Sequence, residues 1–272
     1  MPELPEIATR AHQMNAELSG KRITHIEVFQ SKCLNISPTE FIERLVGAKI
    51  GQVTYHGKWL FVSTSQGWLL LNLGMGGEVL LVNRTSLPEK YRLIFDFDDG
   101  SCMTVNFWWF GYAHYVPTDQ LPSHAMTAKL GANALDLDGA ALKKLFKGQH
   151  TRLKALMLDQ SKIAGIGNAY IHDILFLARL HPLRTIDSLK EDEIEKLAKG
   201  IQDGLRPSLE KGGAFYEVDL FGHKGGFTMD DILIGYKENR PCPVCLTSIQ
   251  KIKTGSTSSF ICPSCQRFES VV

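Results

Sequence analysis

Two pairs of cysteines near the end of the 272-residue chain limit its fold more than any other feature of the sequence. Two residues separate the cysteines within each pair, and 16 residues lie between the pairs, which are Cys242 with Cys245 and Cys262 with Cys265. Thiolates are soft ligands that favour zinc, and two tight turns at this spacing can bring four of them together beside a β-hairpin. Redox chemistry would need only one pair. The sequence therefore predicts a zinc finger with one structural Zn²⁺, whose four thiolate ligands leave no position for catalysis at the metal.

The chain before the cysteines has a β-rich half and then a helical half, which is typical of a multi-domain α+β protein. Apolar residues at helical spacing predict a helix over 3–18. Short stretches of branched and aromatic residues, separated by turn residues, predict antiparallel strands in a sandwich or barrel up to residue 117. Two of these stretches, 52–64 and 101–116, are predicted to be single strands. An Asp-Asp-Gly turn at 98–100 predicts a hairpin that leads into the second one.

From residue 136 onward, the apolar residues recur with the longer helical period, which predicts a second, helical domain. Five glycines between 212 and 227 predict a flexible loop within it. The predicted organisation is a β-rich domain at 1–117, a linker at 118–135, the helical domain at 136–235 and the zinc finger at 236–268, with its hairpin tip at 253–259.

The charge balance does not by itself indicate a nucleic-acid partner, because 30 basic and 29 acidic residues give a net charge of only +1. A local basic face could still bind phosphate. No apolar run reaches the roughly 20 residues needed to span a bilayer, and the N-terminus lacks the pattern of a secretory signal. We therefore expect an intracellular protein without a membrane partner, in which Cys33 and Cys102 are buried free thiols.

The N-terminal residues MPELPE carry a pattern that suits nucleophilic chemistry. Removal of the initiator Met would expose the secondary amine of Pro2, and an α-amine has a reference pKa of about 8 against about 10.4 for lysine. A neutral amine can attack the anomeric carbon of a sugar and form an iminium. Glu3 and Glu6 lie on one face of the first helical turn, where one of them could transfer protons. The structural alternative is that proline and acidic residues are simply favoured in a first helical turn.

A second candidate motif is GIGNAY at 165–170, between two helical segments. Its glycines permit close backbone approach, and Asn168 would open the next helix. A helix N-terminus of this kind binds phosphate readily, although a plain connection between two helices explains the same residues.

These motifs occur in an order that resembles the formamidopyrimidine-DNA glycosylase/endonuclease VIII family. MPELPE is followed by the β-rich region, by LDQ and AGIGNAY at 158–170, and by the cysteine pairs ending in CPSCQR, so the resemblance extends from residue 1 to about 268. It implies an N-terminal helix with an antiparallel β-sandwich, then a helix–two-turn–helix domain with a C-terminal β-hairpin zinc finger. We expect the protein to be a monomer, because nothing in the sequence signals an oligomer, and to lie in the bacterial cytoplasm or nucleoid.

The resemblance also implies an activity. Family members bind double-stranded DNA that contains a damaged base or an abasic site, flip the damaged nucleotide out of the duplex and excise its base. They then act as AP lyases and cut the abasic strand by β,δ-elimination. By this resemblance Pro2 is the Schiff-base nucleophile, Glu3 its acid/base partner, Glu6 the second acid and Lys58 a basic residue near the lesion phosphates. Leu4 favours the branch that excises oxidised purines.

Further residues match the DNA contacts of the family. Lys154 and Asn168 match residues that clamp phosphate, and Lys224 matches a lysine after the loop that caps the flipped base. Met75 matches a residue that fills the gap left by that base, and Phe110 matches an aromatic that wedges beside it.

The sequence departs from the family pattern at several of these contacts. NFWWFG at 106–111 stands where the family has D-P-R-R-F-G, so Trp108 and Trp109 replace two arginines. An indole can stack on a base but cannot read its identity as a guanidinium does, so we expect Trp109 to stack and Trp108 either to pack inward or to join it. Thr257 replaces a phosphate-binding arginine at the hairpin tip, Asn72 replaces a histidine, and the 214–223 loop is slightly short.

Because all of these departures lie on DNA contacts, the reaction type is predicted more firmly than the substrate. An oxidised purine is the default lesion. The alternative is an enzyme or damage-binding protein of the same fold that accepts bulky or other lesions, with little preference for the opposite base and weak excision of oxidised purines. A third hypothesis is an unrelated zinc-ribbon protein that binds RNA or protein.

Overall fold

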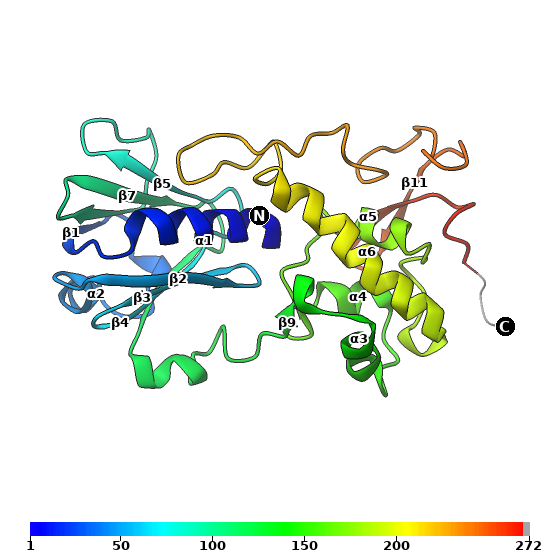
Figure 1. The fold of residues 1–272 in the computed structure, drawn as a ribbon, viewed down its shortest axis with the longest axis horizontal. Helices are drawn as coiled ribbons and strands as arrows, with labels where there is room; N and C mark the ends of the chain where they lie inside the picture. Colours follow the sequence, from blue (N-terminus) through cyan, green and yellow to red (C-terminus); the bar gives the residue numbers. More distant parts are fainter. Residues whose placement is uncertain (269–272) are drawn as a thin grey trace. The chain divides into compact units, whose positions relative to one another are not determined.

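The first element of the computed structural model, which describes residues 1–268, is helix α1 (Leu4–Leu18; Figure 1). Its second residue is Pro5, at a position where the missing N–H removes no hydrogen bond of the helix. Its apolar face is buried in the core of the β-rich region and consists of Ile7, Ala11, Met14 and Leu18. The helix predicted over 3–18 is confirmed.

Two four-stranded antiparallel sheets share this core and form the predicted β-sandwich. The first sheet has the order β1 (Ile23–Val28), β6 (Leu93–Phe97), β7 (Ser101–Asn106) and β5 (Glu78–Asn83). The second sheet has the order β2 (Ile50–His56), β3 (Trp59–Thr64), β4 (Gly67–Asn72) and β8 (Tyr112–Val116). The hairpin predicted at 98–100 is confirmed, because β6 and β7 pair as antiparallel neighbours.

Both long stretches predicted to be single strands are divided in the structure, so these two predictions are wrong. A turn at Gly57 and Lys58 separates β2 from β3, which are hairpin partners. The chain leaves the first sheet after Asn106 and enters the second sheet at Tyr112. The aromatic run between them is therefore a loop that joins the two sheets.

Helix α2 (Pro38–Leu45), which was not predicted, follows the short 3₁₀ segment η1 (Ser31–Cys33). The hydroxyl of Ser37 accepts a hydrogen bond from the backbone N–H of Glu40, and Pro38 occupies the first turn. Phe41 and Leu45 anchor the helix in the sandwich core. Cys33 and Cys102 are buried free thiols as expected, and burial raises the pKa of Cys33 to about 11.

The second half of the chain is mainly helical. Gly200 and Gly204 of α6 (Glu191–Glu210) face Ile174 of α5 (Ile171–Leu177). A Cβ added to these glycines would lie 2.8 and 2.6 Å from atoms of Ile174, so the glycines permit close packing of the two helices. The helices are α3 (Gly139–Phe146), α4 (Leu153–Leu158), α5 (Ile171–Leu177) and α6 (Glu191–Glu210). The strands are the parallel pair β9 (Ala132–Asn133) and β10 (Ile163–Ala164) and the antiparallel hairpin β11 (Gln250–Thr254) and β12 (Thr257–Ile261). Short 3₁₀ segments are η2 (Thr118–Ser123), η3 (Ala134–Asp136) and η4 (Ile186–Ser188).

The described chain forms two compact units. The first unit combines residues 1–129 with 211–226, and the second combines 130–210 with 227–268. The segment 211–226 returns to the first unit because Leu220 is buried in the sandwich core and its carbonyl accepts a hydrogen bond of 2.8 Å from the Leu81 N–H. The four predicted domain segments, and the flexibility of 212–227, stay predictions.

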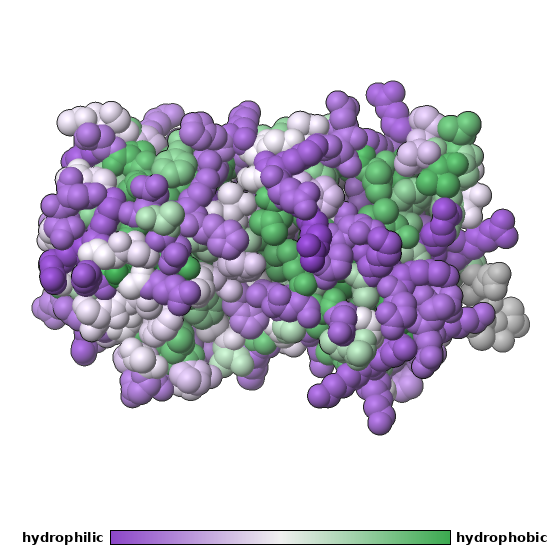
Figure 2. Space-filling model, in the orientation of Figure 1, coloured by the Kyte–Doolittle hydropathy of each residue, from purple (hydrophilic) through white to green (hydrophobic). Residues whose placement is uncertain are grey.

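Hydrophilic side chains cover most of the molecular face drawn in Figure 2, with apolar patches between them. Among residues 1–268, no helix is both long enough and apolar enough to cross a bilayer.

Candidate functional site

The N-terminal corner of the first unit buries two carboxyl groups beside Pro2. The backbone N–H of Glu3 donates to Oε2 of Glu6 at 2.8 Å, within a capping box that starts α1. The backbone N–H of Ala214 donates to Oε1 of the same Glu6 at 3.1 Å. Both oxygens of Glu6 therefore accept hydrogen bonds from backbone N–H groups, and the Glu3 side chain accepts the Glu6 backbone N–H within the same capping box. The catalytic roles expected of Pro2, Glu3 and Glu6 stay predictions.

A buried ion pair that the sequence analysis missed fixes the 211–226 segment on α1. Arg10 is only 1% exposed, and its Nη2 lies 3.2 Å from Oε2 of Glu217. Next to this pair, Nε2 of Gln13 donates to Asp219 at 2.9 Å, and Oε1 of Gln13 accepts from the Leu220 N–H at 2.9 Å. Burial raises the pKa of Glu217, although the Arg10 guanidinium opposes that shift. Side chains of α1 therefore hold residues 217–220 of the segment in place.

Four large apolar side chains, which we call the aromatic tip, project from two adjacent loops of the first unit. The exposed fractions are 49% for Met75, 65% for Trp108, 64% for Trp109 and 69% for Phe110. The Met75 N–H donates to the Trp109 carbonyl at 2.9 Å, and the Trp108 N–H donates to the Met75 carbonyl at 3.2 Å. Inward packing of Trp108 was one of two interpretations, and it is wrong. Phe107 is the ring of this run that enters the core.

The backbone of the aromatic tip is closely packed. Gly74 has a φ of +56°, and an added Cβ would lie 2.1 Å from the Trp109 carbonyl oxygen. A Cβ on Gly111 would lie 2.1 Å from the ring of Phe107. Phe110 has a φ of 57°, which is uncommon for a residue other than glycine. The tip therefore holds its rings outward on a constrained backbone, at some cost in strain.

Asn72 joins this tip to the turn that carries Lys58. Its Nδ2 donates to the Lys58 carbonyl at 3.2 Å, and its Oδ1 accepts from the Gly74 N–H at 3.0 Å. Lys58 is half-buried in the turn between β2 and β3, and Lys224 is exposed at the end of the anchored segment. The roles expected of Lys58, Met75, Phe110 and Lys224 stay predictions.

In the second unit, the glycine-rich turn at 165–170 is shaped by Gln160. Its Nε2 donates to the Ile166 carbonyl at 2.8 Å, and its Oε1 accepts from the Gly165 N–H at 3.0 Å. Helix α5 begins at Ile171, so the expectation that Asn168 opens the helix is wrong. The Asn168 carbonyl instead accepts a hydrogen bond from the Tyr236 hydroxyl at 3.3 Å, while its Oδ1 is buried without a hydrogen-bond partner in the described chain. A phosphate contact by Asn168 stays a prediction.

Lys154 of α4 is 3% exposed, and its ammonium contacts the β11–β12 hairpin. Four oxygens of the hairpin lie within hydrogen-bond distance of Nζ: Thr254 Oγ1 at 3.2 Å, Thr257 Oγ1 at 3.1 Å, the Ser258 carbonyl at 2.7 Å and Ser259 Oγ at 2.9 Å. Burial lowers the pKa of Lys154 to about 8, so the charged form still predominates at neutral pH. The side chains of Lys154 and Thr257 are hydrogen-bonded to each other in this structure. The phosphate contacts expected of both residues remain predictions.

His172 of α5 lies against the same hairpin. Its Nδ1 accepts a hydrogen bond from the Phe260 N–H at 3.4 Å, which requires the neutral ring. Burial, and secondarily the charge of Lys154, lower the pKa of His172 to about 3 from 6.5. As the pH falls below 6.5, the unfolded chain binds a proton at this residue that the folded chain excludes until about pH 3. This difference lowers the free energy of unfolding by up to about 1.4 kcal/mol per pH unit over that range.

We therefore expect wild-type protein to lose more stability than His172→Gln between pH 7 and pH 4. Glutamine can accept the Phe260 hydrogen bond but does not titrate. Denaturant unfolding of both proteins at the two pH values measures the difference. The lowered pKa values of His114, His124 and His181 are common to both proteins and cancel. Equal losses would contradict the assignment of a neutral, buried His172.

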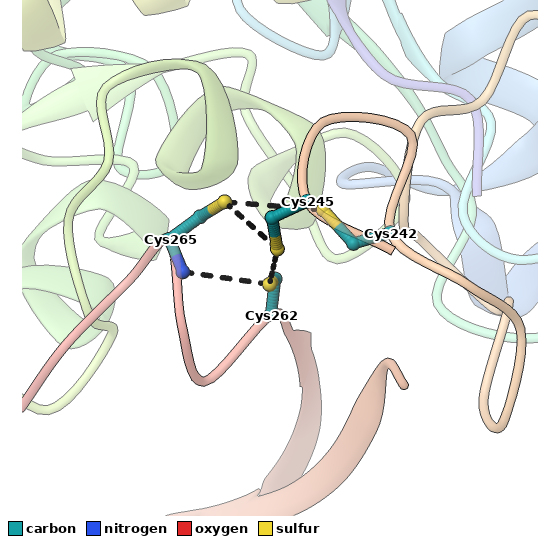
Figure 3. Close-up of side chains that lie close together, drawn as sticks. All are labelled: Cys242, Cys245, Cys262 and Cys265. Atoms are coloured by element: carbon teal, nitrogen blue, oxygen red, sulfur yellow. Dashed lines mark hydrogen bonds between the residues drawn. The ribbon is translucent and has the colours of Figure 1, made fainter. Parts of the chain in front are cut away.

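The four cysteines of the sequence motif meet beside the hairpin (Figure 3). Their Sγ atoms all lie within 4.8 Å of one another, and individual separations are 3.9 Å for Cys242 to Cys265, 3.4 Å for Cys245 to Cys262 and 3.5 Å for Cys245 to Cys265. Tetrahedral zinc with Zn–S bonds of about 2.3 Å would place the sulfurs about 3.8 Å apart. The cluster therefore fits a metal ion held by four thiolates.

The expected site residues are distributed over both units. The N-terminal corner and the aromatic tip belong to the first unit, which holds Pro2, Glu3, Glu6, Lys58, Met75, Trp109, Phe110 and Lys224. The second unit holds Lys154, Asn168, Thr257 and the four cysteines. Arg10 and Glu217 were not predicted, because an isolated polar residue carries no signal of a partner 207 residues away. Gln160 belongs to the LDQ segment, but its hydrogen bonds to Ile166 and Gly165 were not predicted.

Comparisons with known proteins agree with the order of these elements. Residues 1–107 match the model of the formamidopyrimidine-DNA glycosylase N-terminal domain, and residues 130–218 match that of the formamidopyrimidine-DNA glycosylase H2TH domain. The formamidopyrimidine-DNA glycosylase of Pelotomaculum thermopropionicum is 34% identical, over 98% of this chain and 99% of its own length. That of Gluconobacter oxydans is 33% identical, over 98% of this chain and 100% of its own length.

Solved structures show the same likeness. A complex of Lactococcus lactis Fpg with DNA that contains an abasic site has a TM-score of 0.90 and 25% identity, and the match covers 98% of this chain and 100% of that one. A complex of the wild-type Lactococcus lactis protein with DNA that contains N7-benzyl-Fapy-dG also has a TM-score of 0.90 and 25% identity, with the same coverage.

Proposed function

This chain belongs to the formamidopyrimidine-DNA glycosylase family, and on that premise we propose that it is a bifunctional DNA glycosylase and AP lyase of base excision repair. Its partner would be double-stranded DNA with a damaged base or an abasic site, bound by one copy of the chain. The observation that carries the proposal is the N-terminal corner, where Pro2 precedes a buried Glu3 inside the matched family domain. Those two residues supply a nucleophile and a proton-transfer group side by side.

In the proposed reaction, initiator Met is absent and the neutral amine of Pro2 attacks C1′ of the flipped nucleotide. A bond forms between nitrogen and C1′, and the glycosidic bond breaks with its electron pair leaving on the base. Glu3 transfers protons at the sugar ring, which opens to the Schiff base, and β,δ-elimination then cuts the strand on both sides of the sugar. Glu6 keeps the first helical turn and Ala214 in place during these steps through its two backbone hydrogen bonds.

We also propose that the metal held by the four cysteines is zinc. Thiolates select zinc over magnesium or calcium, and the observed sulfur separations match a tetrahedral site. Bound zinc would hold the ends of the β11–β12 hairpin together and would take no part in the chemistry.

The aromatic tip supports a proposal about specificity. Trp109 and Phe110 are exposed, and Met75 is on the adjacent loop, whose backbone pairs with that of Trp108 and Trp109. Stacking depends little on which base is present, since every base has a π-face. We therefore propose that the tip fills the space left by the flipped nucleotide with little preference for the opposite base. An oxidised purine is the default lesion.

A second candidate function is a protein of the same fold that binds or excises bulkier lesions and acts weakly on oxidised purines. The observation that favours it is the exposure of both Trp108 and Trp109, which provides more stacking surface than one wedge requires.

A panel of duplexes tests both candidates. Each duplex carries one lesion, such as an oxidised purine, an oxidised pyrimidine or a bulky adduct, opposite each of the four bases. The proposed function requires release of the free base and cleavage of the strand for at least one lesion, with rates that differ less than tenfold among opposite bases. Tight binding without base release, or faster release of the bulky adduct than of the oxidised purine, would favour the second candidate. A preference of tenfold or more for cytosine would contradict the proposed role of Trp109.

Single substitutions at the tip provide a matched test. We expect Trp109→Ala to weaken binding to duplex with an abasic-site analogue by about 1–3 kcal/mol, because a base loses its stacking partner. Phe29 is an exposed aromatic of the same unit outside the tip, so Phe29→Ala serves as the control and should leave affinity unchanged. Fluorescence anisotropy measures both dissociation constants. Equal affinity of Trp109→Ala and wild type would contradict the stacking role.

A further inference from the structure

A cavity of about 430 Å³ lies beside the zinc hairpin, entirely within the second unit. The start of α4 forms one side of it with Arg152 and Lys154, and the hairpin turn from Thr254 to Thr257 forms another. Leu158, Pro182 and Leu183 add an apolar wall. The cavity thus combines a cationic and hydroxyl-bearing rim with an apolar surface.

Lys154 cannot offer this cavity a free donor in the observed geometry. An ammonium has three N–H groups. Four hairpin oxygens surround Nζ at 2.7 to 3.2 Å, and the side chain is 3% exposed. A phosphate could reach this ammonium only if the hairpin first released it. Lys154 therefore acts as a buried support of the hairpin.

Arg152 differs from Lys154 because the described residues do not occupy the hydrogen-bond donors of its side chain. Its side chain is exposed, and its guanidinium has neither a hydrogen bond nor an ion pair within residues 1–268. Asp159 also lines the cavity, but its Oδ1 already accepts hydrogen bonds from the Ser161 N–H at 2.9 Å and the Ser161 hydroxyl at 2.7 Å. Arg152 is thus the cation at this rim whose five N–H donors are available to a ligand.

These features match one nucleotide unit of a DNA strand. A guanidinium binds phosphate through two parallel hydrogen bonds, and the Ser256 hydroxyl and turn N–H groups can add further ones. The apolar wall of Leu158, Pro182 and Leu183 offers a surface for the carbon face of a deoxyribose.

We propose that Arg152 is a DNA-binding residue, which pairs with a backbone phosphate whose sugar packs in this cavity, while Lys154 holds the hairpin that forms the other rim. The assignment rests on the proposed function, since it takes DNA as the ligand. The hairpin tip has the uncharged Thr257, so the charged contact with phosphate would come from Arg152 on the other side of the cavity.

The salt dependence of binding tests the assignment, because each phosphate neutralised contributes about 0.9 to the slope of log Kd against log salt concentration. Arg152→Gln should lower that slope by about one for duplex with an abasic-site analogue, relative to wild type. Arg206→Gln, an exposed arginine on α6 of the same unit, is the matched control and should keep the wild-type slope. The double variant Arg152→Gln/Thr257→Arg places a guanidinium on the other rim and should restore the slope.

Lys154→Met tests whether Lys154 supports the hairpin or binds phosphate. It should accelerate zinc loss to a chelator and leave the salt slope of the zinc-loaded protein at the wild-type value. An unchanged slope for Arg152→Gln, or a slope reduced by one for zinc-loaded Lys154→Met, overturns the assignment. If wild-type protein shows no salt-dependent DNA binding, the proposed function falls together with it. If wild type binds with a steep slope and Arg152→Gln matches it, only the assignment falls.

Discussion

Replacing Glu3 by glutamine is expected to lower the single-turnover rate of base release by about 10²- to 10⁴-fold, with little change in affinity for lesion DNA. Glutamine has the shape of glutamate and keeps an oxygen that can accept hydrogen bonds, but it cannot exchange a proton at neutral pH. The capping box that starts α1 should therefore survive, with a change in stability of less than about 1 kcal/mol. Rapid-quench measurement of base release, combined with thermal unfolding, separates the two effects.

Glu6→Gln is the matched comparison because it changes the neighbouring carboxyl group. Both oxygens of Glu6 accept backbone N–H groups, from Glu3 and Ala214. An amide would present an NH₂ group to one of these donors, and leaving a buried donor unsatisfied costs about 1–3 kcal/mol. Glu6→Gln should therefore lose more stability than Glu3→Gln and less of its chemical rate. The reverse ranking would contradict the division of roles between the two acids.

Removal of the metal is expected to unfold the β11–β12 hairpin and with it the surface formed by Thr254 to Thr257. Structural zinc sites in small modules contribute about 10–16 kcal/mol of apparent binding free energy, which exceeds what a two-stranded hairpin can supply alone. The apolar residues beside the cluster are few: Phe176, Ile234, Ile249 and Phe260. We expect Cys262→Ala to lose both stoichiometric zinc and the hydrogen-exchange protection of β11 and β12.

Cys102→Ala is the control for that experiment, because Cys102 is a buried free thiol of β7 that lies outside the cluster. It should retain one zinc per chain by elemental analysis and full protection of the hairpin. A metal-free wild-type protein with a protected hairpin would contradict the structural role of zinc.

The sequence predicted best those features whose partners lie close together in the chain. Each Cys-x2-Cys pair is local, so the cluster followed from spacing and ligand chemistry. Helix α1 and the turn at 98–100 are likewise local patterns. Helix α2 was missed although Ser37, Pro38 and Glu40 form a recognisable helix start, because it interrupts a long β-rich region.

Contacts between distant residues could not be predicted in the same way. Arg10 and Glu217 are 207 residues apart, and Lys154 is at least 100 residues from its hairpin partners. The single strand predicted over 101–116, which left the exposure of Trp108 open, was wrong for a related reason. The alternation expected of a strand applies only within one sheet, and the chain crosses from β7 to β8 at this run. Phe107 fills the core at the crossing, which turns the next three rings outward.

The identity of the nucleophile is tested most directly by trapping the covalent intermediate. The mature protein is incubated with abasic-site DNA and sodium borohydride, which reduces a Schiff base to a stable amine, and the adduct is digested and sequenced by mass spectrometry. We predict that initiator Met is absent and that the reduced sugar is attached to the nitrogen of Pro2. Absence of any adduct, or attachment to a lysine such as Lys58 or Lys224, would contradict catalysis by the N-terminal amine.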